Sequence, residues 1–260
     1  MVDIKELIIG AVGGGSMQAL EGKVAIVTGA GQGVGEGVAL ALAEAGAAVV
    51  VAGRTLEKVE RTAGTIEERG GRAKAVRCDV TDPDDVQACV DGTVADFGTV
   101  DILVNNAQVP PLGPLAEIPE ALFEEGWKTG PLATFRFMRA CHPHLKDGGV
   151  IVNMGSGSAI RPDLTAFGGY GACKEAIRTM SRAAACEWGR DGIRVNVVLP
   201  LAMSPGMAGF LEAHPEALDG VLGSIPLGFI GDSEREIGPA VVWLCSDAAK
   251  YVTGTSICVD

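Results

Sequence analysis

The stretch Val24–Gly35, which reads VAIVTGAGQGVG, decides how the chain folds. It joins a short apolar run, Val24 to Val27, to a glycine-rich turn, and an Ala- and Leu-rich helical pattern follows over residues 34–45. An apolar run of this kind is typical of a buried parallel strand. Glycines let the backbone turn tightly and approach a ligand, while the N-terminus of the next helix presents free N–H groups to a pyrophosphate. The stretch therefore predicts a strand, a nucleotide-binding loop and a helix.

Strand and helix patterns alternate from Lys23 to the end of the chain. Such alternation implies a parallel sheet that helices cover on both faces. We therefore predict one α/β domain over residues 23–260. Further strands are expected at residues 49–52, 73–78, 101–104, 149–154, 194–198 and 256–259, and helices at 56–69, 83–96, 119–146 with an interruption at Gly130-Pro131, 170–188 and 234–246.

Residues 1–22 differ from this pattern and form a predicted N-terminal extension. An amphipathic helical pattern comes first, and the flexible linker Gly13-Gly14-Gly15-Ser16 follows it. Residues 1–16 have two interpretations. They are either a docking peptide for a partner, resembling the short targeting helices that lead enzymes into protein compartments, or an upstream segment without a role.

Composition excludes several classes of protein. Hydrophobic residues make up 47% of the chain and charged residues 21%, as in ordinary globular proteins. The net charge of −12 disfavours nucleic acid and anionic membranes as partners. The seven cysteines are scattered and the three histidines lack ligand spacing, so we expect reduced thiols, no metal site and a cytoplasmic location. No apolar run reaches the length of a membrane span.

Tyr170 and Lys174 are the first candidate catalytic residues. Residues four apart share one face of a helix, and an ammonium near a phenol lowers the phenol pKa from about 10 towards neutrality. Tyr170 would then be a usable acid and base at physiological pH. Ser156, in the small-residue turn after the strand at 149–154, would polarise the group that receives the proton, with Ser158 as the alternative.

Taken together, Thr28-Gly29-x3-Gly33-x-Gly35, Asn105-Asn106-Ala107, Ser156 and Tyr170-x3-Lys174 resemble the short-chain dehydrogenase/reductase family over about residues 20–260. The resemblance implies a Rossmann-type doubly wound sheet of seven strands, a nicotinamide dinucleotide cofactor and, usually, a homotetramer. It also implies interconversion of a ketone and a secondary alcohol. Tyr170 would be the acid/base, Lys174 would lower its pKa and hold the nicotinamide ribose, and Ser156 would bond the substrate oxygen.

The end of the second strand bears on which dinucleotide is used. An acid there would accept hydrogen bonds from the ribose of NAD, whereas Arg54 suits the 2′-phosphate of NADP, so we predict NADP over NAD. The resemblance places Asp79 and Val80 beside the adenine and Asn105 on its ribose side. The implied cofactor-binding residues are Gly29, Gly31, Gln32, Gly33, Val34, Gly35, Arg54, Thr55, Asp79, Val80, Asn106, Ala107, Tyr170, Lys174 and Pro200.

Several positions depart from the family pattern. Gly130 stands where relatives have an asparagine that supports a water chain from the lysine, so we expect proton relay through water and backbone alone, or an impaired relay. Gln108 replaces a glycine close to the nicotinamide, Leu201 replaces the glycine of a Pro-Gly pair, and Ser204 is the nearest match to a threonine. Gly130 and Gln108 leave two alternatives open: a slow or non-redox enzyme, and a nucleotide-binding regulatory or structural subunit.

The substrate is expected to be a small neutral molecule. Residues 201–230 are apolar and punctuated by glycine and proline, and the resemblance makes them a lid over the substrate. Apolar residues at Pro110, Pro111, Ile160, Phe167 and Leu201 would line its pocket. We see no cation dedicated to a carboxylate or phosphate, so a fairly hydrophobic alcohol or ketone is expected.

Overall fold

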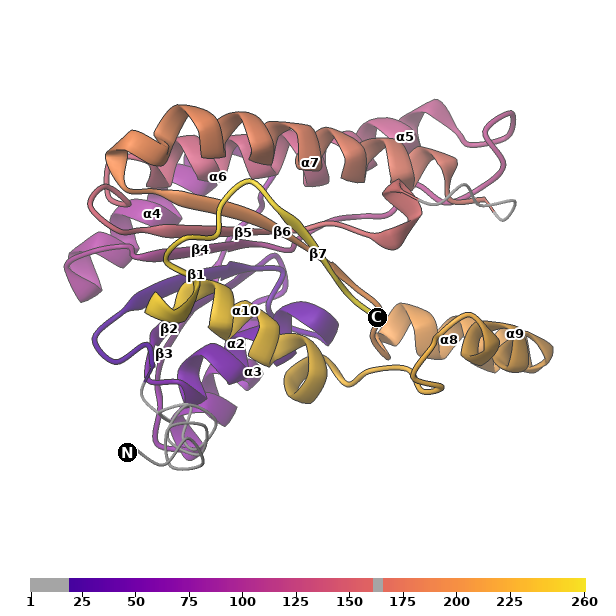
Figure 1. Cartoon of the computed structure of the whole chain (residues 1–260), viewed down its shortest axis with the longest axis horizontal. Coiled ribbons are helices and arrows are strands. Elements are labelled where there is room, and N and C mark those ends of the chain that lie inside the picture. The colour runs from indigo at the N-terminus through magenta and orange to yellow at the C-terminus, as the bar shows by residue number, and fades with distance from the viewer. Residues whose placement is uncertain (1–18, 161–165) are drawn as a thin grey trace, which may run out of the picture.

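The computed structural model describes residues 19–160 and 166–260, and the predicted docking segment 1–16 lies outside them. The described chain forms a seven-stranded parallel sheet in the order β3-β2-β1-β4-β5-β6-β7 (Figure 1). This confirms the predicted fold. The strands are β1 (Val24–Thr28), β2 (Ala48–Gly53), β3 (Arg72–Arg77), β4 (Ile102–Asn105), β5 (Val150–Met154), β6 (Arg194–Pro200) and β7 (Ser256–Val259).

Helices cover both faces of the sheet because successive strand side chains point to opposite sides. Val27 packs into the core beneath the helices α2 (Gly33–Glu44), α3 (Leu56–Glu68) and α10 (Gly238–Cys245). Its neighbour Ile26 packs into the other core, which lies beneath α4 (Pro83–Phe97), α6 (Ala133–Cys141) and α7 (Gly168–Trp188) (Figure 1). No helix of the described residues is both long and apolar enough to cross a bilayer.

The helical region predicted at residues 119–146 is divided into three parts. The helix α5 (Glu120–Trp127) leads into a π-helical turn, Lys128–Leu132, and α6 then ends at Cys141. Pro131 lies inside the turn and has no N–H to donate, so the regular ladder is broken at the predicted place. The prediction that the helix reaches residue 146 is wrong, because Pro143 removes another backbone donor and turns follow.

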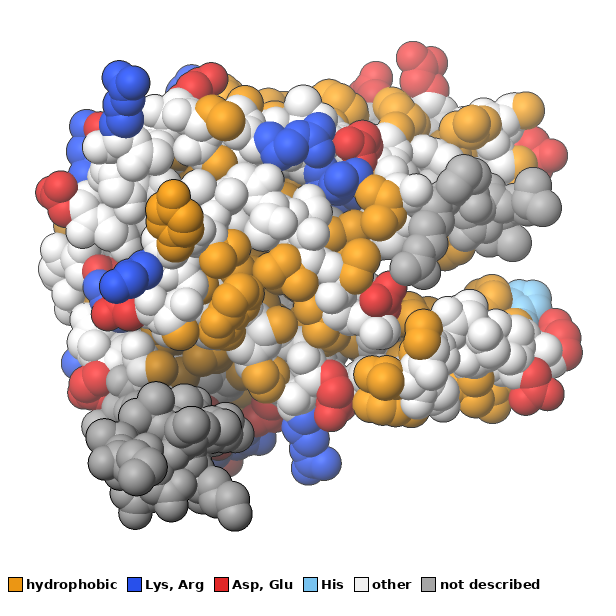
Figure 2. Space-filling view, viewed as in Figure 1, with side chains coloured by type: hydrophobic (Ala, Val, Ile, Leu, Met, Phe, Trp, Pro, Cys, Tyr) orange, Lys and Arg blue, Asp and Glu red, His pale blue; other side chains and the backbone are white. Residues whose placement is uncertain are grey.

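The segment of residues 201–230, between β6 and α10, extends beyond the carboxyl edge of the sheet. It carries the short helices α8 (Pro205–Ala213) and α9 (Leu218–Gly223), seen at the right of Figure 1. A parallel bridge between Ala202 and Gly231 closes its base. Several of its apolar side chains are exposed, including Met203, Phe210, Leu227 and Phe229. Figure 2 shows apolar side chains along the region that α8 and α9 occupy in Figure 1.

Candidate active site

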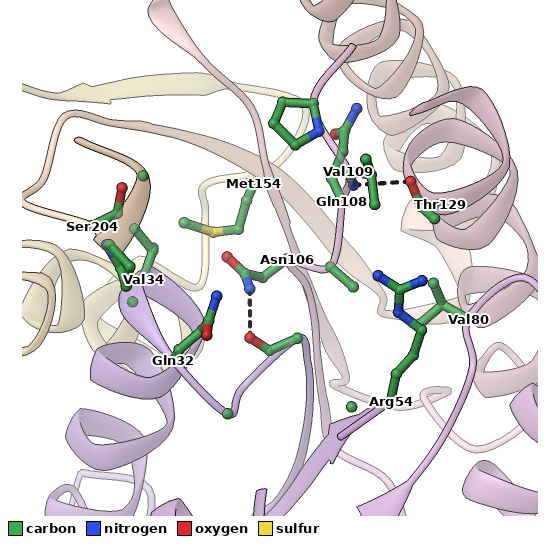
Figure 3. A pocket seen from close by; sticks show the side chains of 18 of the residues that line it. Gln32, Val34, Arg54, Val80, Asn106, Gln108, Val109, Thr129, Met154 and Ser204 are labelled. Atoms are coloured by element: carbon green, nitrogen blue, oxygen red, sulfur yellow. Dashed lines mark hydrogen bonds between the residues drawn. The ribbon is translucent and has the colours of Figure 1, made fainter. Parts of the chain in front are cut away.

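A cleft of about 520 Å³ opens at the carboxyl ends of the central strands. Chain connections run in opposite directions from β1 and β4, and ligands of such sheets bind at this switch point. Arg54 and Val80 lie at one end of the cleft, Asn106 lies near its middle, and Met154 and Ser204 lie towards the other end (Figure 3). The cleft therefore has the position of a dinucleotide site.

Two loops are tied together across the switch point by Thr28. Its hydroxyl oxygen accepts hydrogen bonds from the backbone N–H groups of Asn106, at 3.0 Å, and Ala107, at 3.1 Å. In return the Asn106 carboxamide donates to the carbonyl oxygen of Thr28 at 3.0 Å and to that of Gly29 at 3.2 Å, and Figure 3 draws one of these two bonds. These hydrogen bonds hold the loop after β1 and the loop after β4 together at the base of the cleft.

The glycine loop leaves no room for side chains. Gly29 and Gly33 have φ angles of 65° and 60°, which L side chains rarely adopt. A Cβ at Gly29 would lie 2.8 Å from the Ala107 Cα. At Gly35 it would lie 2.4 Å from the Asn106 carboxamide nitrogen. Gly35 is therefore required for packing behind the loop, and it does not line the cleft.

The N-terminus of α2 faces the cleft through Gly33 and Val34. The side chain of the preceding residue, Gln32, makes no capping hydrogen bond to the first turn. Backbone N–H groups in the first turn of a helix have no partner within the helix and favour anions. The loop and this helix end therefore fit the pyrophosphate of a dinucleotide.

Two cations, Arg54 and Lys58, line the cleft beside β2 and the glycine loop. Arg54, which the sequence analysis assigned to the 2′-phosphate of NADP, follows β2, lines the cleft and is exposed. Lys58, which the sequence analysis missed, lies in the first turn of α3 and donates to the Gln32 carboxamide oxygen at 2.5 Å. A cation in the first turn of a helix opposes the helix dipole, and this was the signal that could have pointed to an anion site.

Asp79 and Asn105 lie apart from the cleft. The Asp79 carboxylate accepts hydrogen bonds from the backbone N–H and the hydroxyl of Thr81, at 2.9 and 2.8 Å. Burial works to raise the pKa of Asp79, but these bonds and the nearby Arg54 and Arg77 lower it overall. The Asn105 carboxamide, expected near the ribose, is buried and donates to Asn153 at 2.8 Å. The Asp79 carboxylate thus holds the turn at Thr81, and the Asn105 carboxamide joins β4 to β5 through Asn153.

The catalytic candidates come together from β5 and α7. Tyr170 lies in the first turn of α7 and shares a hydrogen bond with Ser156, whose oxygen also accepts from the Ser158 N–H at 3.2 Å. Ser156, and not Ser158, is therefore the serine that faces the phenol. Lys174 is buried and donates to the Met154 carbonyl at 2.7 Å, with its ammonium nitrogen 5.5 Å from the Tyr170 ring centre.

The pKa values in this cluster are governed by burial. Burial lowers the pKa of Lys174 to about 8, because the charged ammonium loses its hydration. Burial likewise raises the pKa of Tyr170 to about 12, and the hydrogen bond with Ser156 opposes this rise. The expectation that Lys174 lowers the Tyr170 pKa towards neutrality is not met in this structure, because the ammonium lies over the ring and is directed at Met154.

Gln108 and Gly130 are in direct contact at the wall of the cleft. A Cβ on Gly130 would lie 2.7 Å from both the Cδ and the Nε2 atom of Gln108. Next to them the Thr129 hydroxyl donates to the Glu125 carbonyl at 2.7 Å and accepts from the Val109 N–H at 3.0 Å (Figure 3). The two departures from the family pattern are thus a single local feature.

Most of the predicted site residues line the cleft, and Gly35, Asp79 and Ser156 do not. The sequence analysis did not assign Lys58, Thr129, Pro205 or Gly206, which also line it. Of the residues expected in the apolar wall, Pro110 lines the cleft, whereas Pro111, Ile160, Phe167 and Leu201 are not among its lining residues. Within residues 19–160 and 166–260, no three His, Cys, Asp or Glu side chains form a group that could hold a metal ion. The predicted residues that do line the cleft are Gly29, Gly31, Gln32, Gly33, Val34, Arg54, Thr55, Val80, Asn106, Ala107, Tyr170, Lys174 and Pro200.

Known proteins share this architecture along nearly the whole chain. The family model described as Enoyl-(Acyl carrier protein) reductase matches residues 29–260. The 12alpha-hydroxysteroid dehydrogenase of a Clostridium species is 38% identical, over 94% of this chain and 97% of its own. The 3beta-hydroxysteroid dehydrogenase 1 of Eggerthella lenta is 35% identical, over 93% of each chain.

A solved structure extends the likeness to three dimensions. It is that of a 7 alpha-hydroxysteroid dehydrogenase complexed with NADH and 7-oxo glycochenodeoxycholic acid. Its TM-score is 0.88 at 31% identity, over 94% of this chain and 96% of that one. The chain belongs to the short-chain dehydrogenase/reductase family. It is an oxidoreductase that acts on CH–OH groups.

Proposed function

We propose that the protein is an NADP-dependent oxidoreductase that interconverts a hydrophobic ketone and the corresponding secondary alcohol. The observation that carries this proposal is the Tyr170–Ser156 pair, with the Lys174 ammonium beside it, at the far end of a dinucleotide cleft from Arg54 and Lys58. One end of the cleft offers an acid/base, and the other offers two cations.

The residues of this chain divide the work of ketone reduction. When bound, the cofactor supplies a hydride to the carbonyl carbon. The Tyr170 hydroxyl donates its proton to the carbonyl oxygen, which Ser156 holds by a hydrogen bond. Lys174 provides a positive charge that stabilises the phenolate left on Tyr170. Its own pKa of about 8 means that this charge is present at neutral pH and is lost above about pH 8.

The preference for NADP rests on the end of the cleft beside β2. No carboxylate is among the residues that line the cleft there, whereas the side chains of Arg54 and Lys58 are. An arginine can bind a phosphate through two parallel hydrogen bonds, and a lysine adds a point charge. The hydroxysteroid dehydrogenase of the solved structure was complexed with NADH, so this end of the cleft is where we expect the two proteins to differ.

The substrate class is inferred from the relatives and from the exposed segment α8–α9. Hydroxysteroid dehydrogenases are among the relatives. Apolar side chains such as Met203, Phe210 and Phe229 are exposed on the segment whose residues 204–206 line the cleft. We therefore propose an alicyclic substrate of about steroid size, and we propose that residues 201–230 close over it as a lid.

The test is turnover with a panel of ketones that runs from cyclohexanone to oxo-steroids, measured with NADPH and with NADH. The proposal predicts NADPH-dependent reduction, with the highest kcat/KM for the oxo-steroids. Comparable kcat/KM values for NADPH and NADH would contradict the cofactor assignment. Turnover of small ketones alone would contradict the substrate class.

A second function, a regulatory or structural subunit that binds the nucleotide without turnover, stays open on one observation. The Tyr170 pKa of about 12 leaves the phenol protonated and demands a strong stabilisation of the phenolate during reaction. Tight binding of NADPH with no reduction of any ketone would favour this function.

Assembly and location are also proposals. We propose a cytoplasmic homotetramer that covers exposed aromatic side chains, including Trp127 and Phe135 on either side of the π-helical turn, Trp243 on α10 and Tyr251 before β7. Figure 2 shows apolar side chains over the region that β7 occupies in Figure 1. Light scattering coupled to gel filtration tests this, and a monomeric mass would contradict it.

A further inference from the structure

Arg136 on α6 reaches out of its own helix to the loop that follows β3. Its guanidinium donates a hydrogen bond to the Thr81 carbonyl oxygen at 2.5 Å, across 55 positions of sequence. Arg136 is half-buried, so this charged donor is partly shielded from water. Hydrogen bonds from a charged donor are roughly twice as strong as those between neutral groups. Arg136 is therefore a strong restraint on the backbone at Thr81.

The loop around Thr81 is also closed by its own hydrogen bonds and tied to α4. The Asp79 carboxylate accepts from the N–H and the hydroxyl of Thr81, and the Asp79 carbonyl accepts from the Asp82 N–H at 3.0 Å. The Asp79 N–H in turn donates to the Asp85 carboxylate of α4 at 2.9 Å. These bonds make the loop one compact turn, which Asp85 fastens to α4 and Arg136 fastens to α6.

This turn forms part of the wall of the cleft. Cys78 and Val80 are among the lining residues, and Figure 3 shows Val80 at the same end of the cleft as Arg54. Val80 is 4% exposed, so its side chain cannot move independently of the backbone that carries it. Arg136 itself does not line the cleft. The position of this part of the wall therefore depends on a residue that lies outside the cleft.

We propose that Arg136 is a positioning residue for the adenosine half of the cofactor. By holding the Thr81 carbonyl oxygen it fixes the backbone that carries Val80, so that this part of the wall is preformed for binding. The inference rests on the proposed function, in which NADP binds with its 2′-phosphate at Arg54. Without the Arg136 hydrogen bond the loop would adopt this conformation for a smaller fraction of the time, and the dissociation constant would rise in inverse proportion to that fraction.

The experiment compares wild-type protein with Arg136→Met, which keeps a long unbranched side chain and removes the donor. The probes are adenosine 2′,5′-bisphosphate, which is the adenosine half of NADP, and reduced nicotinamide mononucleotide, which is the other half. We expect the dissociation constant of the bisphosphate, measured by calorimetry, to rise about fivefold, as for a loop that is correctly placed about one fifth of the time. The dissociation constant of the mononucleotide, measured by fluorescence titration, should change by less than about 1.5-fold, because distant sites are energetically independent.

Two further variants separate the hydrogen bond from the charge of Arg136. Arg139→Met makes the same change of charge on the exposed face of α6, where the Arg139 guanidinium carbon lies 5.6 Å from the centre of the Phe135 ring. It should leave both dissociation constants unchanged. Arg136→Lys keeps a cationic donor, and one N–H is enough to reach one carbonyl oxygen. We therefore expect the dissociation constant of the bisphosphate to return to within about twofold of wild type in Arg136→Lys.

An Arg136→Met protein that binds the bisphosphate as tightly as wild type would overturn the inference. The same factor of weakening for both probes would also overturn it, because a general loss of structure acts on both. An equal loss of affinity in Arg139→Met would assign the effect to net charge, again against the inference. If Arg136→Met does not fold, Arg136→Gln carries the test, because its donor lies closer to the backbone and falls short of Thr81; wild-type affinity in that variant would contradict the positioning role.

Failure of this inference and failure of the proposed function can be told apart. Absence of ketone reduction by the wild-type protein would remove the proposed function. The Arg136 comparison is read from binding of the bisphosphate, which requires no turnover.

Discussion

The two ends of the cleft are built in different ways. At the glycine loop the groups available to a ligand are backbone N–H groups. Glycine is needed at positions 29, 33 and 35 because a side chain there would collide with neighbouring atoms or strain the backbone. At the other end the working groups are side chains of Ser156 and Tyr170, together with the buried Lys174. The first end depends on backbone shape, and the second depends on polar groups held out of water.

This difference has an energetic consequence. The glycine loop buries no charged side chain, so it has no desolvation cost. The same backbone conformation stabilises the fold and binds the ligand. A buried ammonium lowers stability unless it is compensated, and Lys174 has the Met154 carbonyl as its protein acceptor at 2.7 Å. Mutations at the loop should therefore reduce stability and binding together, whereas mutations at the Tyr170 end should separate activity from stability.

Tyr170→Phe should produce the largest effect. Removing the hydroxyl deletes the proton donor, so kcat for ketone reduction should fall by about 10³-fold or more, within the range for general acid–base catalysis. Affinity for NADPH, measured by fluorescence titration, should stay within about threefold of wild type because the phenol contributes one of many contacts. A variant that retains more than a tenth of wild-type kcat would show that another group donates the proton.

Gly35→Ala tests the loop end. The new Cβ would meet the Asn106 carboxamide and the Gly29 carbonyl oxygen at 2.4 Å, so we expect a loss of about 2–3 kcal/mol in the free energy of unfolding and weaker NADPH binding. The matched control is Gly64→Ala in α3, where a Cβ meets nothing within 4 Å and should stabilise by up to about 1 kcal/mol. Denaturant titrations of both variants provide the comparison. Equal effects would contradict the packing role of Gly35.

Lys174→Met tests the cost of the buried charge. The pKa of Lys174 is lowered from 10.5 to about 8, so the unfolded chain binds more protons between these values and wild-type stability should rise as pH increases from about 8 to 10.5. At pH 7 the full cost is present. We expect the variant to be more stable by about 1–3 kcal/mol, reduced from the linkage value by the orphaned Met154 carbonyl, and to be inactive.

The stability gain of Lys174→Met should shrink over the same pH interval. Urea titrations at pH 7 and pH 10 measure it. A variant that is less stable than wild type at pH 7 would show that the ammonium stabilises the fold.

Arg54→Ala and Lys58→Ala should have the smallest effects, because both side chains are exposed. We expect the KM for NADPH to rise about tenfold for Arg54→Ala and about threefold for Lys58→Ala, with little change for NADH. These ratios should decrease at high salt, since screening weakens exposed charge pairs. Steady-state kinetics with both cofactors tests this, and parallel changes for NADPH and NADH would exclude a role in phosphate recognition.

Most of the fold and much of the loop end could be predicted from the sequence. The strands follow from local apolar runs, and the loop follows from Gly29 to Gly35, because these signals lie within a few consecutive residues. Arg54 was found by its position directly after a strand. The side chain of Lys58 was missed because its place in the cleft depends on how α3 packs against the glycine loop.

At the Tyr170 end of the cleft, the residues could be predicted from the sequence but their contacts could not. The spacing of Tyr170 and Lys174 indicated a shared helix face, but the direction of the ammonium towards Met154 depends on where β5 ends against α7. Gln108 and Gly130 are 22 positions apart in sequence, and both were predicted to lie near the nicotinamide, but their direct contact was not predicted. The π-helical turn between α5 and α6, which contains Pro131, lies against the loop after β4, and this brings Gly130 and Gln108 into contact.

The most direct test of the account is a single experiment on the wild-type protein. The protein is saturated with NADPH, the excess is removed, and a panel of oxo-steroids is added while the reduced cofactor is followed by absorbance. We predict that the bound NADPH is oxidised, with one alcohol formed for each cofactor consumed. Bound NADPH that persists with every ketone, although the protein stays folded, would contradict the proposed function and favour a nucleotide-binding subunit.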